Sequence, residues 1–438
     1  MNSSLSDDPC LARILELQRA LLDSARAWSE GADDETHTDQ LRSEALELQH
    51  QRYVQRIPAY RHLAEQSDAS GKCDLSTLVN TMMFTTDLFK SYDQGLLESQ
   101  DFSELTGWLS GICAEQLPVQ ARSVSNLDEW IKSLAENGIR LSYSSGTSGM
   151  MSFVPRDPLT WRSLCRNSSV CGNDRWYHTA DGKKRDFDCL VAAPRGDGTG
   201  IQGVANGLAA MAARTHYVDS TVTVTASNLQ EIGRSHAPSV ASNSQRDTLA
   251  LVDFVNAGRE AGRPLLVFGP PFQLRRLCER VQAHCGSLAT HADSVVVTGG
   301  GWKSFQGDRI SHDELRDRIE VAFGIGPEKF SDAYSTTELN CALTCCGELR
   351  YHIPPLLEVV VLDEAFCGEP RRPGRGYIGF LDPFALSYPG FVIPGDVAQL
   401  EHGDCKCGLR GWFLRGPIQR APNSETRGCG GVMASLLA

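Results

Sequence analysis

The segment at residues 141–149, which reads LSYSSGTSG, decides the fold class of this chain. Residues 141–143 predict a short strand, and a loop of hydroxyl residues and two glycines follows it directly. The glycines let the backbone turn sharply and approach a ligand closely. Because the hydroxyls and free amides can donate to phosphate oxygens, the segment is either a phosphate-binding loop or an ordinary Ser/Gly turn. It lacks the lysine and the spacing of a Walker-type loop.

Short apolar runs recur further along the chain. Residues 264–271 (PLLVFGPP), 294–298 (SVVVT) and 356–362 (LLEVVVL) predict buried strands. Helices are predicted between them, one at 272–285 and one that begins after the capping pair Ser311 and Glu314. Strands that alternate with helices are typical of an α/β sheet, and we expect additional mixed sheets of α+β character.

The N-terminal part reads differently. Apolar residues near the helical period predict helices from residue 9 to about 66, with a polar loop at 31–39. We expect three parts: a helical region at 1–80, a large domain at 81–412 with both the nucleotide and the acid site, and a short segment at 413–438.

Composition limits the classes of function. The chain has 438 residues, 42 basic and 54 acidic side chains, and a net charge of −12, which argues against a nucleic-acid partner. The first residues do not resemble a secretory signal, and no apolar run approaches the roughly 18 residues of a membrane span. We therefore expect a cytoplasmic protein without a membrane span. The 15 cysteines, an odd number, do not indicate a disulfide framework.

Four motifs in the same order resemble those of the adenylate-forming superfamily, which includes acyl-CoA ligases, luciferases and peptide-synthetase adenylation domains. The loop at 144–149 resembles its phosphate loop, and GGGWK at 299–303 resembles its adenine-contacting turn. YSTTE at 334–338 resembles its aromatic-G-x-T-E motif, and Asp396 after Gly395 resembles its ribose-holding aspartate.

Within that superfamily, the chain most resembles the LuxE-type acyl-protein synthetases, over roughly residues 80–438. The shared motifs are GGGWK at 299–303, HIPP at 352–355, LDP at 381–383, ALSYP at 385–389, CKCG at 405–408 and RGC at 427–429. FTTDLFK at 84–90 also resembles the phenylacetate-CoA-ligase branch. The resemblance implies a ligase that adenylates a fatty acid with ATP and Mg²⁺, transfers the acyl group to its own cysteine, and delivers it to a reductase or acyl-carrier partner.

The resemblance also implies a role for each matching residue. Glu338 would coordinate Mg²⁺, Thr337 would donate to the α-phosphate, Asp396 would accept both ribose hydroxyls, and Tyr334 would stack on adenine. Lys303 is either a catalytic cation or a surface lysine. The other nucleotide-binding positions implied are Ser144, Ser145, Gly146, Thr147, Ser148, Gly149, Gly299, Gly300, Gly301, Ser335 and Thr336.

Two features depart from the superfamily pattern. Met150 follows the phosphate loop where most relatives have a lysine. About 40 residues follow Asp396, so we expect a truncated C-terminal lid without its late lysine. Arg415, Arg420 and Arg427 are the cations available in the tail, and one of them would supply the missing charge, since a guanidinium suits phosphate. The sequence does not decide among them, and we take Arg415 as the first candidate.

Cys429 is the candidate acyl acceptor. Glycines flank it, and Arg427 would favour its thiolate, the nucleophilic form. The matching RGC of the family implies that this thiolate attacks the acyl-adenylate. The alternative is a tail cysteine without a function.

Cysteines and one histidine suggest a metal site. Cys405 and Cys407 form a C-x-C turn, and Cys345 or Cys346 together with His352 could complete a tetrahedral zinc site. The alternative is a set of buried or free thiols.

Other functions remain open. Residues 189–216 should border the acid pocket, where small residues either open a channel or let helices pack closely, so the acid is not defined. A CoA ligase, a ligase with an amine acceptor, and a weakly active adenylate-binding partner of a reductase are the alternatives. The sequence does not define the oligomeric state.

Overall fold

The computed structural model describes residues 8–117, 124–144, 150–170, 174–179, 181–193, 195–196, 198–218, 225–227, 245–300 and 309–421. Its N-terminal region is helical, as predicted. The helices are α1 (Pro9–Ser29), α2 (Glu35–Arg56), α3 (Pro58–Gln66) and α4 (Leu75–Thr81). The side chains of Asp8, Asp34 and Asp74 accept from the first-turn amides of α1, α2 and α4, which fixes where these helices begin.

A mixed segment joins this region to the main sheet. It contains β1 (Phe84–Thr85), η1 (Thr86–Lys90), α5 (Gln94–Glu98), α6 (Phe102–Ile112), α7 (Leu127–Glu136), β2 (Arg140–Ser144), β3 (Ser152–Arg156), α8 (Pro158–Val170) and α9 (Asp174–Tyr177). Strands β2 and β3 form a separate antiparallel pair on either side of residues 145–149. The strand predicted before the Ser/Gly loop is therefore confirmed.

Strands and helices then alternate, as the apolar runs predicted. The elements are β4 (Asp188–Val191), α10 (Gly200–Met211), β5 (Arg214–Tyr217), α12 (Gln245–Glu260), β6 (Leu265–Gly269), α13 (Pro271–Cys285), β7 (Val295–Gly299), α14 (His312–Phe323), η3 (Pro327–Lys329) and β8 (Phe330–Tyr334). Helix α14 begins where Ser311 accepts from the amide of Glu314, as predicted.

The remaining strands are mostly antiparallel. They are β9 (Leu343–Cys345), β10 (Arg350–His352), β11 (Glu358–Leu362), β12 (Gly374–Leu381), β13 (Phe391–Ile393), β14 (Asp396–His402) and β15 (Trp412–Arg420). The boundary expected after residue 412 falls within β15, which pairs with both β10 and β14. The division into three parts stays a prediction.

One mixed sheet organises the described residues. Its order is β1-β13-β12-β14-β15-β10-β9-β8-β7-β6-β4-β5, with β11 paired to β12. Strands β5, β4, β6, β7 and β8 are parallel, and the sheet becomes antiparallel between β8 and β9. This architecture confirms the α/β class with mixed α+β character.

Helices cover both faces of the parallel half, where strand residues alternate between two cores. Val267 packs with residues of α12, α13 and α14, whereas its neighbours Leu266 and Phe268 pack with residues of α9 and α10. A parallel strand covered on both faces reads as a continuous apolar run. This explains why LLVFG and VVVTG were recognisable in the sequence.

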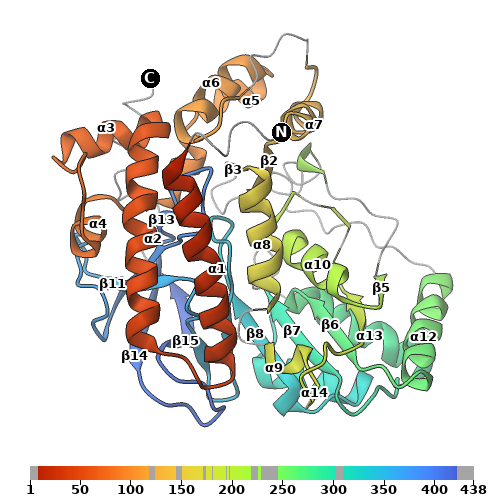
Figure 1. Cartoon of the computed structure of the whole chain (residues 1–438). Coiled ribbons are helices and arrows are strands. Elements are labelled where there is room, and N and C mark those ends of the chain that lie inside the picture. The colour runs from red at the N-terminus through yellow and green to blue at the C-terminus, as the bar shows by residue number, and fades with distance from the viewer. Residues whose placement is uncertain are drawn as a thin grey trace.

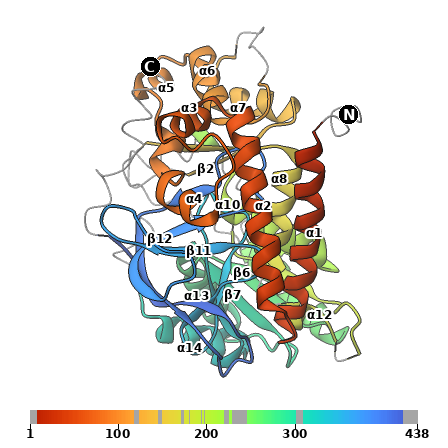
Figure 2. The same cartoon turned by 60° about the vertical axis from the view of Figure 1, so that its left-hand side comes forward.

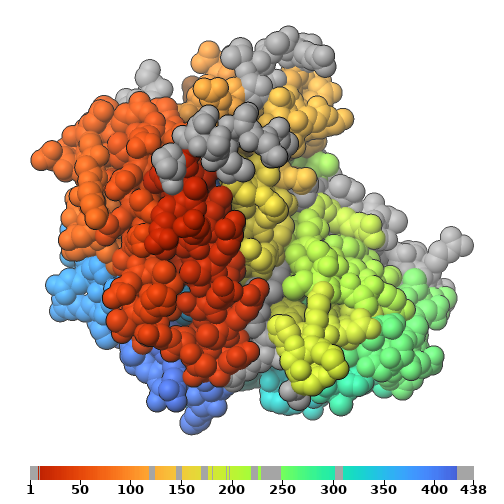
Figure 3. Space-filling view, viewed as in Figure 1, coloured from red at the N-terminus to blue at the C-terminus, as the bar shows by residue number. Residues whose placement is uncertain are grey.

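The N-terminal helices cover the antiparallel half. Tyr53 of α2 meets the ring of Phe391 of β13 at 5.5 Å, within the largest hydrophobic core. Helices α1 and α2 lie side by side along this half, while α12 and α14 lie at the other end of the sheet (Figures 1 and 2). In the space-filling view of Figure 3, the N-terminal helices form the left side of the visible surface, and the region of α12 forms the right side.

Candidate functional site

Two of the motifs meet at one edge of the sheet. Gly299 ends β7, and its register partner is Ala333, the residue before Tyr334 at the end of β8. A Cβ on Gly299 would lie 3.1 Å from the carbonyl oxygen of Ala333, and Gly300 has a φ of 81°, which favours glycine. Ligands of open α/β sheets bind outside the carboxyl ends of the strands. This edge is therefore the natural place for a ligand.

Tyr334 contacts the third motif directly. Its hydroxyl donates to Asp396 Oδ2 at 2.6 Å, although 62 residues separate the two in the sequence. The Tyr334 ring stacks on Phe380, with centroids 6.1 Å apart and an angle of 28°. Burial, followed by the Asp396 carboxylate, raises the pKa of Tyr334 well above its usual range, so the phenol remains a donor. The geometry fixes Asp396 at the same edge as Gly299 and Gly300.

The TTE part of the motif lies in a turn in which Glu338 is buried and the two threonines are half-buried. The side chain of Glu338 is buried, and burial raises the pKa of this carboxyl, an effect that the Thr336 hydroxyl opposes. Ser335 Oγ donates to the carbonyl of Cys341 at 2.9 Å, which closes the turn. A desolvated carboxylate gains from a cation, and Mg²⁺ prefers such oxygen ligands. Glu338 therefore fits the role of a magnesium ligand.

An arginine that the sequence did not single out lies behind this turn. Arg156, at the end of β3, is fully buried. Its Nη2 donates to the carbonyl of Thr337 at 2.7 Å and to the carbonyl of Leu339 at 3.3 Å. Its Nε donates to Asn340 Oδ1 at 3.1 Å. The strand that leaves the Ser/Gly loop is thus bound to both sides of Glu338.

The LDP and ALSYP motifs complete the same network. Tyr388 donates its hydroxyl to the carbonyl of Glu338 at 2.6 Å. Asp382 accepts from the backbone amides of Asn340 and Phe384, both at 2.8 Å. Burial raises the pKa of Asp382 to about 6. These motif residues support the turn from behind. The sequence indicated these positions only as the shared motifs LDP and ALSYP, without a role for Asp382 or Tyr388.

The residues that flank the Ser/Gly loop contact each other and the segment before α10. Ser144 Oγ lies 2.9 Å from Ser152 Oγ, which joins β2 to β3 at the loop. Tyr143 donates its amide to the carbonyl of Gly198 at 2.7 Å. A Cβ on Gly200, at the start of α10, would lie 3.9 Å from Thr337 Cα, so α10 begins beside the TTE turn. Ser145, Gly146, Thr147, Ser148, Gly149, Gly301, Lys303 and Cys429 lie outside the described residues.

The small residues of α10 include one with a clear packing role. A Cβ on Gly203 would lie 2.9 Å from Leu164 Cδ2 of α8 and near Trp161. Gly203 therefore lets α10 and α8 approach closely. This favours the helix-packing interpretation over a channel at that position.

Of the three tail arginines, Arg427 lies outside the described residues, and the other two differ in their surroundings. Arg415 makes a bidentate ion pair with Glu401, at 2.8 and 2.7 Å. Arg420 is the register partner of Asp396, and its Nη1 lies 3.5 Å from Asp396 Oδ1. Arg420 rather than Arg415 is therefore the described tail cation beside the candidate site.

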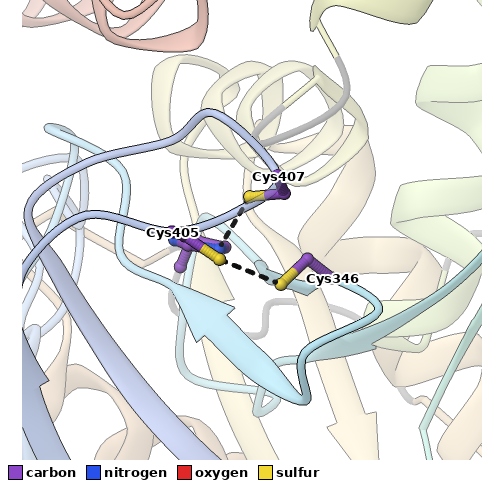
Figure 4. Close-up of side chains that lie close together, drawn as sticks. Cys346, Cys405 and Cys407 are labelled. Carbon is purple, nitrogen blue, oxygen red and sulfur yellow. Dashed lines mark hydrogen bonds between the residues drawn. The ribbon is translucent and has the colours of Figure 1, made fainter.

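The predicted metal ligands come together. Figure 4 shows the thiols of Cys346, Cys405 and Cys407 facing one another from two loops. The ligand atoms of these cysteines and of His352 all lie within 4.8 Å of one another, so the cluster could hold a metal. Cys345, the other option that the sequence left open, is buried in β9 and is not in this cluster.

The distances fit a tetrahedral ion. Cys346 Sγ lies 3.6 Å from Cys405 Sγ, and Cys407 Sγ lies 3.3 Å from His352 Nε2. Zinc–sulfur bonds of about 2.3 Å in a tetrahedron place two sulfurs about 3.8 Å apart. Hydrogen bonding from Cys407, and then from His352, holds the pKa of Cys346 well below its usual range, and a thiolate is the form that binds metal.

Solved structures identify the class of fold. The chain is similar to 2-hydroxyisobutyryl-CoA ligase in an open conformation with 2-HIB-AMP and CoA, at 13% identity and a TM-score of 0.51, over 88% of this chain and 75% of that chain. The same ligase in its thioesterification state matches at 14% identity and a TM-score of 0.53, over 89% and 69%. The chain has the fold of an adenylate-forming enzyme.

Sequence comparison identifies the family. The model described as "Acyl-protein synthetase, LuxE" matches residues 209–438, more than half of the chain, so the chain belongs to this family. The long-chain-fatty-acid–luciferin-component ligase of Vibrio harveyi is 26% identical over 153 residues, 34% of this chain and 40% of the relative. The ligase of that name from Aliivibrio fischeri is 26% identical over 187 residues, 41% of this chain and 47% of the relative. The matched stretches span less than half of these relatives.

Within the described ranges, we find no helix of sufficient length and apolar character to cross a membrane.

Proposed function

We propose that this chain activates a carboxylic acid with ATP as an acyl-adenylate and then passes the acyl group to a thiol, with Cys429 as the acceptor. The observation that supports the proposal is the contact between Tyr334 and Asp396, because it joins two motifs to which we assign nucleotide binding. Membership of the LuxE family supports the same activity.

The first step needs positioned donors. A carboxylate oxygen of the acid forms a bond to the α-phosphorus of ATP, and the bond from that phosphorus to the bridging oxygen breaks, so pyrophosphate leaves. The transition state carries charge on phosphate oxygens, which fixed donors stabilise. In our proposal Thr337 donates to the α-phosphate, the loop at 144–149 donates to the leaving phosphates, and Asp396 accepts from the ribose.

Glu338 would hold the magnesium ion. Mg²⁺ neutralises charge that develops on the phosphates during such displacements. The buried carboxylate of Glu338, beside the hydroxyl of Thr336, fits this ligand role. In our proposal adenine lies against the backbone of Gly299 and Gly300, and Tyr334 presents its ring to it.

The second step forms a thioester. The thiolate sulfur of Cys429 bonds to the acyl carbon, and the bond from that carbon to the adenylate oxygen breaks, so AMP leaves. We propose a fatty acid as the substrate and a reductase or acyl-carrier protein as the next acceptor, because the curated relatives are named long-chain-fatty-acid ligases. A structural zinc ion in the cluster of Cys346, His352, Cys405 and Cys407 would fasten the two loops that carry it.

Acid-dependent exchange of labelled pyrophosphate into ATP tests the first step. With ATP, Mg²⁺ and a panel of fatty and aromatic acids, we expect exchange with at least one acid. We expect Glu338→Gln to lower the rate at least a hundredfold, since it removes the metal ligand. Glu358→Gln is the matched control, because Glu358 is equally buried but pairs with Arg42. Absence of exchange with every acid would contradict the proposal.

A further inference from the structure

Arg156 occupies an unusual position for a charged side chain. It is fully buried, yet its contacts among the described residues are to carbonyls, to an amide oxygen and to the Tyr388 hydroxyl, with no carboxylate in direct contact. Its Nη1 has no hydrogen-bond partner within the described part of the chain. A buried guanidinium is costly unless its donors are well used. The groups to which Arg156 donates therefore indicate the role of this side chain.

The contacts of Arg156 are concentrated on one turn. Nη2 donates to the carbonyls of Thr337 and Leu339, the residues before and after Glu338. Tyr388 closes the set, since its hydroxyl donates to the Glu338 carbonyl and its ring lies 5.2 Å below the guanidinium. The carbonyls of Thr337, Glu338 and Leu339, three in succession, thus each accept a hydrogen bond from Arg156 or Tyr388.

The other end of the connection is β3, the strand that follows the Ser/Gly loop in the sequence. Arg156 ends β3, which pairs with β2, and the two strands flank residues 145–149. Met150 follows this loop, so no lysine of the loop itself can join it to the TTE turn. Arg156 is the described residue that bonds the strand leaving the loop to the backbone on both sides of Glu338.

We propose that Arg156 is a positioning residue that sets the distance and orientation between β3, the strand that leaves the Ser/Gly loop, and the Thr337–Glu338 pair. In this role Arg156 orients Glu338, the proposed magnesium ligand, relative to the phosphates of the nucleotide. It contacts neither the Glu338 carboxylate nor the phosphates. The inference rests on the proposed function for the identity of the nucleotide as ATP.

Arg156→Lys is the test variant. Lysine keeps the charge but offers one nitrogen in place of the planar fork, so it cannot hold Thr337 and Asn340 together. The matched control is Arg52→Lys. Arg52 is also buried and donates to a backbone carbonyl, that of Leu386, but it does not contact the TTE turn. Thermal melting verifies that each variant is folded.

The measurements are pyrophosphate exchange against Mg²⁺ concentration, and calorimetric binding of ATP with and without Mg²⁺. For Arg156→Lys we expect kcat to fall about 10- to 100-fold and the half-saturating Mg²⁺ concentration to rise about tenfold, because misplacement by about 1 Å has such effects. The gain in ATP affinity on adding Mg²⁺ should also be lost. For Arg52→Lys, neither quantity should change more than about threefold.

The outcomes separate this inference from the proposed function. Unchanged Mg²⁺ dependence in Arg156→Lys, or an equal loss in Arg52→Lys, overturns the positioning role. If the wild-type chain shows no exchange, but Arg156→Lys loses its Mg²⁺-dependent ATP binding, the positioning role stands and the proposed reaction fails. A wild-type chain with neither exchange nor Mg²⁺-dependent binding overturns both.

A second variant decides the case in which Arg156→Lys does not fold. Tyr388→Phe removes the hydroxyl that contacts Arg156 and the Glu338 carbonyl, while the ring remains. We expect the same rise in Mg²⁺ requirement, smaller in size. An unchanged requirement in Tyr388→Phe then overturns the inference.

Discussion

The hydroxyl of Tyr334 donates to Asp396 Oδ2 at 2.6 Å. This hydrogen bond joins the last residue of β8 to the first residue of β14. Strands β9, β10 and β15 lie between these two strands in the sheet. The bond therefore crosses the part of the sheet where the antiparallel half begins. It ties the residue proposed to face adenine to the residue proposed to bind ribose.

Replacing Tyr334 with phenylalanine tests this relationship. Without the phenol, Asp396 loses the donor that orients its carboxylate. We expect the KM for ATP in the exchange reaction to rise about tenfold, or about 1.4 kcal/mol, in the range of a hydrogen bond to a charged group. Steady-state kinetics at varied ATP concentration provides the number.

Tyr351→Phe is the control for that variant. The hydroxyl of Tyr351 donates to Asp332 Oδ2, also at 2.6 Å, on the same strand β8 but away from Asp396. We expect its KM for ATP to stay within about twofold of wild type, because the loss does not reach Asp396. An equal rise in both variants would show that general loosening of β8 is responsible.

The tail arginines give a second prediction. We expect Arg420→Ala to lower kcat/KM for ATP about tenfold, because Arg420 is the described tail cation nearest Asp396. Arg415→Ala should change it less than about twofold, since an exposed pair such as Arg415–Glu401 contributes little. Kinetics of both variants under identical conditions decides between them. A larger effect at Arg415 would restore our first choice of cation.

Asp382 gives a pH prediction. Its pKa in the folded chain is raised to about 6 by burial, above the usual value of 3.8. The folded state then binds more protons than the unfolded state between about pH 4 and pH 6, so stability falls as pH rises through this window. The shift of about two units corresponds to roughly 3 kcal/mol.

Asp382→Asn lacks this titration, which makes it the comparison. Urea unfolding of wild type and Asp382→Asn should be measured at intervals from pH 4 to pH 7. We expect the difference in unfolding free energy, wild type minus variant, to fall by roughly 3 kcal/mol over that range. A constant or rising difference would refute the raised pKa.

The metal cluster gives a fourth prediction. We expect the purified chain to contain about one zinc per molecule by elemental analysis, and Cys407→Ser to lose it. The midpoint of thermal unfolding should fall by about 5 °C or more, because metal binding contributes to folding. Cys367→Ser is the control, since this exposed cysteine lies outside the cluster. Zinc retained by Cys407→Ser, or absent from wild type, contradicts the assignment.

The sequence could predict most of the regular structure. The run VVVTG is apolar because β7 is covered on both faces, and that burial makes the strand visible without any contact information. Cap residues such as Ser311 act on the next few amides, so the start of α14 is also a local property. The polar loop expected at 31–39 is shorter in the structure. Asp34 is the N-cap of α2, so the helix already begins at Glu35.

The candidate site was only partly predictable. The metal ligands were recognisable because cysteine and histidine are the usual ligands of zinc. They are Cys346, His352, Cys405 and Cys407. The choice between Arg415 and Arg420 depends on the register of β14 with β15, which shifts between Val397 and Gln399. The role of Arg156 depends on a contact over 181 residues to Thr337, and no local pattern distinguishes it from a surface arginine.

The most direct test of the account is intact mass of the chain after incubation with ATP, Mg²⁺ and the acid panel, before and after hydroxylamine. We expect a mass gain of one acyl group that hydroxylamine removes, that Cys429→Ala abolishes, and that Cys367→Ala retains, because a thioester forms on the tail cysteine. No adduct with any acid, or an adduct that persists in Cys429→Ala, would contradict acyl transfer to Cys429.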